Sequence, residues 1–268
     1  MNWIDSHAHL NDPAFDADRT EVLARMQTAG VERFVEIGCQ INEWEKALAL
    51  CQAYPNRARA ALGIHPEFAH TWTSAERERF KKLLTNPQVV AVGEIGLDYF
   101  YLDECPKDTQ LHTLQQMLQL ATEFQKPVVL HVRRQAEDYE PYEHTFAYLK
   151  QYWTAPAGSK WSGVLHCFSA RYEEAKQALD QGLLLGINGC FTYKKNEYIR
   201  EAVKKVGADK LVLETDCPYL APQGKRGTRN DPSNIPLIGT WVADYLNMPL
   251  EKLAEITTKN ALDLYHWQ

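Results

Sequence analysis

Short apolar segments alternate with longer helix-type segments along most of this chain, and this alternation constrains the fold more than any other feature. Several of the apolar segments lack a polar face, which is typical of parallel strands covered by helices. We expect strands at Trp3–Asp5, Arg33–Ile37, Ala58–Leu62, Val89–Val92, Pro127–Leu130, Gly163–Leu165, Leu183–Gly186 and Lys210–Leu213. Amphipathic segments between them predict helices at Asp18–Ala29, Glu43–Ala53, Thr109–Phe124, Glu173–Gln181 and Glu197–Val206.

Eight such alternations without a break in composition predict an α/β protein, specifically a single (β/α)8 TIM barrel domain over residues 1–268. A doubly wound open sheet is the alternative, but no G-x-G-x-x-G follows the first strand. The segment Pro222–Pro236 is rich in Gly, Pro, Lys and Arg, which indicates a long loop after the last strand. Two extra C-terminal helices are expected near Ile235–Leu246 and Leu250–Tyr265.

Composition narrows the class of protein. A hydrophobic content of 45% is enough for a buried core, and a net charge of −6 excludes a globally basic nucleic-acid binder, though not a local basic patch. The 6 cysteines show no C-x-x-C spacing, so we expect reduced thiols in a cytoplasmic protein. No apolar run approaches the ~20 residues needed to cross a bilayer, so no membrane association is expected.

Histidines and carboxylates follow the predicted strands, where barrel enzymes place their chemistry. His7 and His9 follow the first strand, and residues two apart in an extended chain point to the same side, so both could bind one ion. Five of the 9 histidines lie at the ends of predicted strands, which is more than packing alone explains. The other four, His70, His112, His144 and His266, fall in helices or loops. The remaining strand-end candidates are His65, Glu94, His131, His166 and Asp216.

Four of these histidines and two carboxylates are more ligands than one ion needs. Two divalent ions bridged by a carboxylate account for all six, with the ions about 3.5–4 Å apart. Glu94 is the predicted bridge, because its strand lies between the two histidine groups, and no lysine that could be modified to a bridging ligand stands there. We expect one ion on His7, His9 and Asp216, and the other on His131 and His166.

Longer motifs around these residues resemble the TatD family of metal-dependent deoxyribonucleases. The resemblance extends from residue 5 to the Arg229-Asn230-Asp231-Pro232 loop and beyond, and it departs at Ala170, where the family usually has glycine. The motifs are His7-Ala8-His9-Leu10, Gly63-Ile64-His65-Pro66, Gly93-Glu94-Ile95-Gly96-Leu97-Asp98-Tyr99, Leu130-His131, His166-Cys167-Phe168-Ser169 and Glu214-Thr215-Asp216-Cys217-Pro218-Tyr219-Leu220.

This resemblance implies a metal-dependent TIM barrel that hydrolyses DNA phosphodiesters, often as a 3′–5′ exonuclease. It implies the same ligand set, with Glu94 bridging and His65 contacting the substrate phosphate. Asp216 is the candidate to orient the attacking water and accept its proton, or it acts as a ligand only. The resemblance implies Mg²⁺ as the metal, whereas four imidazoles favour Mn²⁺ or Zn²⁺.

Basic residues follow the fifth, seventh and eighth predicted strands, and aromatic residues, which include Tyr99 after the fourth, are interleaved with them; together they indicate the substrate. Cations beside aromatic rings are typical of single-stranded nucleic-acid binding, whereas solvated lysines and rings that plug the barrel are the alternative. We therefore expect DNA as the partner, as single strands or 3′ ends, with no obligate protein partner. The candidate contacts are Arg133, Lys194, Arg229 and Tyr99.

Two other functions fit the same ligands. The first is hydrolysis of an amide, a lactone or an aminoacyl ester, and the second is a non-catalytic scaffold that retains the fold. Cys167 and Cys217 each adjoin a predicted ligand, and neighbouring residues in a strand point to opposite faces. We therefore expect both thiols to face away from the ligands, and cysteine catalysis is not expected.

Overall fold

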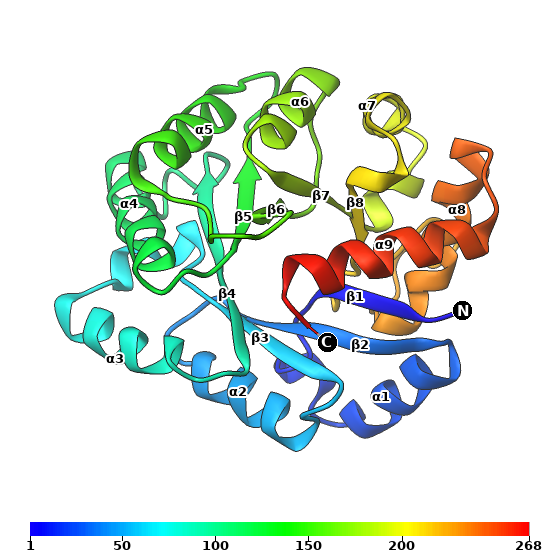
Figure 1. Ribbon diagram of the computed structural model, residues 1–268, viewed down its shortest axis with the longest axis horizontal. Helices are drawn as coiled ribbons and strands as arrows, with labels where there is room; N and C mark the ends of the chain where they lie inside the picture. The colour runs from blue at the N-terminus through cyan, green and yellow to red at the C-terminus, as the bar shows by residue number, and fades with distance from the viewer. Residues whose placement is uncertain (268) are drawn as a thin grey trace.

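The computed structural model describes residues 1–267, and eight parallel strands form its centre (Figure 1). The strands pair in chain order from β1 to β8, so the predicted TIM barrel is confirmed. Their bounds are β1 Trp3–Ala8, β2 Val31–Gly38, β3 Ala58–Leu62, β4 Val89–Asp98, β5 Val128–Arg133, β6 Gly163–Leu165, β7 Leu183–Ile187 and β8 Leu211–Leu213.

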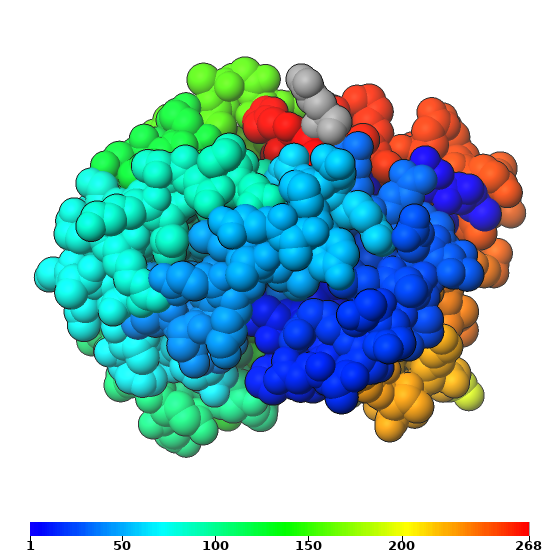
Figure 2. Space-filling view, turned by 90° about the horizontal axis from the view of Figure 1, so that it is seen from below, coloured from blue at the N-terminus to red at the C-terminus, as the bar shows by residue number. Residues whose placement is uncertain are grey.

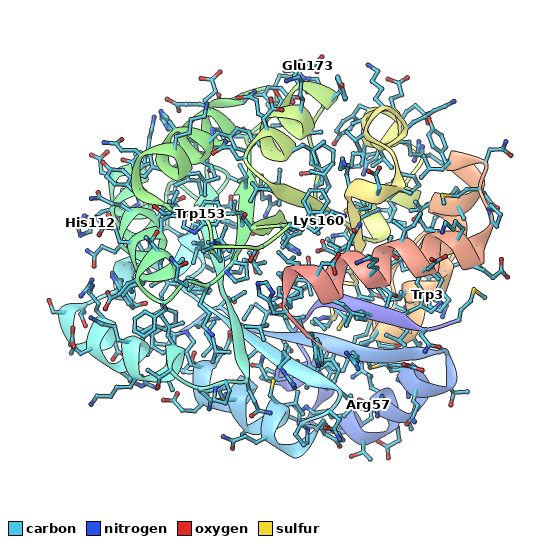
Figure 3. The ribbon with its side chains drawn as sticks, in the orientation of Figure 1. Trp3, Arg57, His112, Trp153, Lys160 and Glu173 are labelled. Atoms are coloured by element: carbon cyan, nitrogen blue, oxygen red, sulfur yellow. The ribbon has the colours of Figure 1, made fainter. Side chains whose placement is uncertain are left out.

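Helices cover the outside of these strands (Figure 1). They are α1 Arg19–Thr28, α2 Trp44–Ala53, α3 Ser74–Leu84, α4 Lys107–Glu123, α5 Glu140–Tyr152, α6 Tyr172–Asp180, α7 Glu197–Val206, α8 Ile235–Leu246 and α9 Leu250–Leu264. Polar side chains point outward to solvent, as His112 on α4 and Glu173 on α6 show (Figure 3). Short 3-10 helices lie in the loops: η1 Pro13–Phe15, η2 Pro66–Thr71, η3 Gly189–Thr192, η4 Ala208–Lys210 and η5 Pro232–Asn234.

The two ends of the strand order meet beside the predicted ligands. The backbone N–H of His9 donates to the carbonyl of Cys217 over 3.0 Å, and the N–H of Asp216 donates to the carbonyl of His7 over 2.9 Å. Early and late segments accordingly lie side by side, with the blue N-terminal part against the orange and red C-terminal part in Figure 2. This closure brings Asp216 next to His7 and His9.

Strand residues alternate between two apolar cores. One set packs inside the barrel and includes Val35, Ala61 and Val212, and the other faces the helices and includes Phe34 and Leu62. This is why the strands are apolar on both faces. The barrel interior is therefore filled with side chains, and the polar residues gather above it, at the C-terminal ends of the strands.

Strand β4 is longer than predicted, and Glu94 lies within it instead of after its end. Gly93 pairs with Val129 and Ile95 with Leu130, so Glu94 is an extra residue with no partner on β5. Such a β-bulge redirects the side chain of the extra residue. Strand β1 has a similar irregularity between Asp5 and Ala8, around His7. Both positions therefore depart from the simple alternation of a strand.

Two further observations concern the whole described chain. All 6 cysteines carry free thiols, as expected. Among residues 1–267, no helix combines the length and the apolar character that crossing a membrane requires.

Candidate active site

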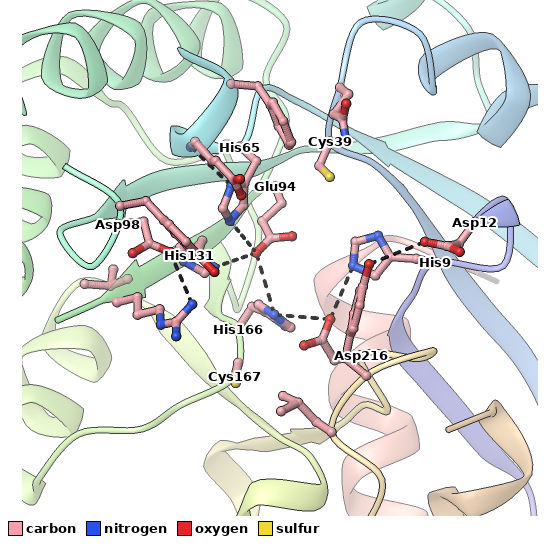
Figure 4. Close-up of a pocket in the computed structure, with 18 of the residues that line it drawn as sticks. His9, Asp12, Cys39, His65, Glu94, Asp98, His131, His166, Cys167 and Asp216 are labelled. Atoms are coloured by element: carbon pink, nitrogen blue, oxygen red, sulfur yellow. Dashed lines mark hydrogen bonds and ion pairs between the residues drawn. The ribbon is translucent and has the colours of Figure 1, made fainter. Parts of the chain in front are cut away.

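The six predicted ligands come together at the C-terminal end of the barrel, although they are spread over more than 200 positions of sequence. Figure 4 shows His9 and Asp216 on one side of this group, His131 on the other, and Glu94 and His166 between them.

The first side of the group consists of His7, His9 and Asp216. The Nε2 atoms of the two histidines lie 3.2 Å apart. Asp216 Oδ1 lies 3.3 Å from Nε2 of His9 and 3.7 Å from Nε2 of His7. Although β1 ends at Ala8, both imidazoles therefore face one carboxylate.

Glu94 connects the two sides of the group. Its Oε2 lies 3.4 Å from Nε2 of His7, and its Oε1 lies 2.8 Å from Nδ1 of His131 and 3.7 Å from Nε2 of His166. The carboxylate is almost fully buried. One oxygen of Glu94 thus faces each histidine group, which is the arrangement that a bridging carboxylate requires.

Two further buried carboxylates hold the second pair of histidines. Asp98 accepts a hydrogen bond of 2.9 Å from Nε2 of His131. Glu214 lies 2.9 Å from Nδ1 of His166 and accepts the backbone N–H of Cys167 over 2.7 Å. Neither carboxylate has a role predicted from the sequence. The available signal was their position, since Asp98 lies four residues after Glu94 and Glu214 two before Asp216.

The charges of the group are strongly coupled. Burial opposes ionisation, but the hydrogen bonds to Asp98 and Glu94 raise the pKa of His131 to about 10. Burial likewise opposes the charge on His166, but Glu214, Glu94 and Asp216 raise its pKa to about 9. Burial alone would raise the pKa of Glu94, yet the neighbouring histidines hold it well below its usual value. The site therefore stabilises positive charge.

These residues fit a divalent-metal centre. Ligand atoms of His7, His9 and Glu94 lie within 4.8 Å of one another, and those of Glu94, His131 and His166 do the same. Imidazole nitrogens with carboxylate oxygens suit borderline ions such as Mn²⁺ and Zn²⁺. The preference of the buried group for positive charge is a second observation that fits a cation.

His65 lies beside the group as a neutral hydrogen-bond donor. Its Nδ1 accepts the backbone N–H of Glu67 over 3.2 Å, so the ring proton belongs on Nε2, which lies 4.0 Å from Oε1 of Glu94. Burial and the charge of His131 lower the pKa of His65 to about 3, so the ring is uncharged at neutral pH. The Nε2–H group is left available to an anion in the site.

A cavity of about 590 Å³ lies over the group, and only one of the four residues predicted to contact substrate lines it. Arg133 lines this cavity. Lys194 lines a separate cavity beside Trp241, and Tyr99 is buried, with its hydroxyl 2.7 Å from Nδ1 of His144. The guanidinium of Arg229 points away, toward Asp18 at 2.6 Å.

The prediction that Cys167 faces away from the ligands is wrong. Strand β6 ends at Leu165, and Cys167 has a φ of 47°, so the strand alternation no longer applies there. Its Sγ lies within 4.8 Å of ligand atoms of His166 and Asp216, and it lines the cavity. Cys217 is fully buried and is not among the residues that line the cavity, as predicted.

Comparisons with known proteins agree with this geometry. The family model of TatD-related DNases matches residues 4–266. The chain is 34% identical to the uncharacterised metal-dependent hydrolase YabD of Bacillus subtilis, with 98% of each chain covered. It is 32% identical to the 3′-5′ ssDNA/RNA exonuclease TatD of Edwardsiella piscicida, again with 98% of each covered. The structure of the TatD homologue YjjV from Escherichia coli superposes with a TM-score of 0.89 at 28% identity, covering 98% of both chains.

Proposed function

The chain belongs to the TatD family of related DNases, and from this premise we propose that it removes nucleotides from the 3′ ends of single-stranded DNA. It is a metal-dependent hydrolase that acts on ester bonds. In the proposal it works as a single barrel domain over residues 1–268. The main support for the proposal is the position of Glu94, which lines the cavity. Its two carboxylate oxygens face two separate histidine groups.

Two divalent ions are proposed, one held by His7, His9 and Asp216 and the other by His131 and His166, with Glu94 between them. When bound, such ions activate water and neutralise the charge that develops on phosphate. The resemblance implies Mg²⁺, while the donor set suits Mn²⁺ or Zn²⁺.

The chain's own residues have separate tasks in this proposal. Burial raises the pKa of Asp216, but His166 and His9 together lower it below its usual value. The carboxylate is therefore ionised and can orient a water and accept its proton. His65 donates its Nε2–H to a non-bridging phosphate oxygen. Arg133 lies at the cavity wall, where its guanidinium can contact the neighbouring backbone phosphate.

The test combines metal analysis with a nuclease assay. Protein purified without chelators is analysed for metal and then incubated with a 5′-labelled single-stranded oligonucleotide in Mg²⁺, Mn²⁺ or Zn²⁺. We expect a ladder of products that keep the 5′ label. Turnover of ester, amide or lactone substrates alone, with the oligonucleotide intact, would contradict the proposal.

A matched pair of variants separates catalysis from a scaffold role. Glu94→Gln keeps the side-chain volume but removes the charge, and we expect loss of both bound metal and cleavage. Glu67→Gln changes a carboxylate that lines the same cavity outside the ligand group, and we expect activity close to that of the unmodified protein. Circular dichroism verifies that both variants are folded.

A further inference from the structure

Two exposed aromatic side chains lie close to the cavity: Tyr219 lines it, and Phe100 contacts Arg133, which lines it. Among the described residues, the large hydrophobic side chains with high exposure are Met1, Phe100, Tyr219 and Trp241. Tyr219 is 56% exposed and lines the cavity. Its ring and that of His9 are arranged edge to face, with 6.2 Å between the ring centroids. Tyr219 therefore stands on the side of the site formed by His9 and Asp216.

Phe100 lies on the other side of the site, and the guanidinium of Arg133 packs against its ring. It is 51% exposed, and the guanidinium of Arg133 lies 4.1 Å from its ring centroid. Arg133 also lies 4.0 Å from Oδ2 of Asp98, which holds His131. In Figure 4, Asp98 and His131 lie opposite His9 and Asp216, with Glu94 between them. The Phe100–Arg133 pair and Tyr219 thus flank the ligand group.

The charge of the cavity determines where a nucleic acid can be held. Within the described chain, Arg133 is the only lysine or arginine that lines this cavity, and its acidic lining residues are Asp12, Glu43, Glu67, Glu94, Asp98 and Asp216. Phosphates are repelled by such a surface except at the metals and at Arg133. Binding energy for the rest of a strand must therefore come from its bases, and stacking on aromatic rings supplies it without regard to sequence.

We propose that Tyr219 and the Phe100–Arg133 pair are two stacking platforms for the bases on either side of the scissile phosphate. The inference rests on the proposed function, which places that phosphate at Glu94. A phosphodiester held there has one nucleoside on each side, and each exposed ring lies on one of these sides. Bases within a duplex are already stacked on each other, so the platforms select unpaired ends.

The test uses oligodeoxythymidine that carries one 2-aminopurine, either at the 3′-terminal or at the penultimate position. Stopped-flow fluorescence with the Mn²⁺-loaded enzyme reports stacking before cleavage, and steady-state assays report KM. We expect quenching at both positions in the unmodified enzyme. Tyr219→Ala should abolish quenching at one position and Phe100→Ala at the other, and each should raise KM about fivefold to a hundredfold.

Two controls isolate stacking from other effects. Tyr219→Phe keeps the ring but loses the hydroxyl contact of 3.4 Å to Asp12, and we expect quenching like that of the unmodified enzyme. Trp241→Ala removes an aromatic ring of 38% exposure outside this cavity, and we expect no change in KM. The inference is overturned if Tyr219→Ala or Phe100→Ala behaves like the unmodified enzyme. It is also overturned if both variants lose quenching at the same position. Quenching without any cleavage by the unmodified enzyme would instead reject the proposed function alone.

Discussion

Asp98 accepts a hydrogen bond from Nε2 of His131, while Nδ1 of the same ring faces Glu94. A carboxylate on the outer nitrogen of a metal-binding histidine fixes the ring orientation and makes the other nitrogen a better ligand. Asp98 is itself fixed, because the backbone N–H of Phe100 donates to its Oδ1 and the side chain of Gln110 accepts its backbone N–H. The ring of His131, a proposed metal ligand, is therefore held in one position by the protein itself.

Asp98→Ala is expected to weaken metal binding about 10- to 100-fold, because His131 loses the partner that orients it. Asp98→Asn retains an acceptor and should have a smaller effect. Competition with a chelating metal indicator at fixed pH measures the affinity. Asp103→Asn, an exposed acid in the following loop, is the control. Unchanged affinity in Asp98→Ala would show that His131 needs no such support.

Gly186→Ala is expected to destabilise the protein by about 1–3 kcal/mol, because an added Cβ would overlap with the carboxylate of Glu214. Glu214 is fully buried beside His166, so its displacement should also reduce activity. Urea unfolding and the nuclease assay measure the two effects. Shortening the neighbour in a Gly186→Ala, Glu214→Asp double variant should recover part of the stability lost by the single change. Additive losses in this cycle would mean that the two residues do not compete for space.

His65→Gln is expected to lower kcat about 100-fold while bound metal stays unchanged, since its Nε2–H is proposed to act on the phosphate and not on the ions. KM should change much less than kcat. Metal content by elemental analysis and steady-state kinetics separate the two roles. His70→Gln alters an exposed histidine in the same segment and should be silent. A loss of metal in His65→Gln would instead identify His65 as a ligand.

The metal-free protein is expected to lose stability as the pH rises from about 6.5 to about 10. The folded-state pKa values of His131 and His166 are raised to about 10 and about 9, against 6.5 for an ordinary histidine. Their contribution is thus complete below pH 6.5 and is lost as they deprotonate. Bound metal competes with these protons, so it should stabilise the fold more at high pH. Thermal unfolding with EDTA or Mn²⁺ tests this, and a Tm difference independent of pH would contradict it.

The fold was largely predictable because its signals are local. The ranges predicted for β3 and β6 coincide with the structure, and the helix predicted at Ile235–Leu246 begins and ends where expected. Strand β4 was predicted at Val89–Val92, and the residue that follows is Gly93, of a type that weakens a strand interior. Its continuation to Asp98 depends on pairing with β5, and Gly96 is needed there because any Cβ would overlap with the carbonyl of His131.

The electrostatic surroundings of the loops were less predictable. Arg229 was expected to contact substrate because it follows the last strand with other cations. In the fold its guanidinium lies 2.6 Å from Asp18 and over the ring of Phe15, more than 200 positions earlier in the chain. No residue near Arg229 in the sequence indicates these partners. Arg133, by contrast, ends β5 and contacts Phe100 in the turn that follows the neighbouring strand β4.

The sequence by itself determined the barrel and the residue types at its catalytic end, because parallel strands bring all their C-terminal ends to one edge. Only the tertiary structure decided where individual side chains point. The bulge at Glu94 and the left-handed turn at Cys167 direct these side chains into the site, and strand alternation predicts neither. The physical reason is that strand register and backbone turns at these positions depend on partners that lie far away in the chain.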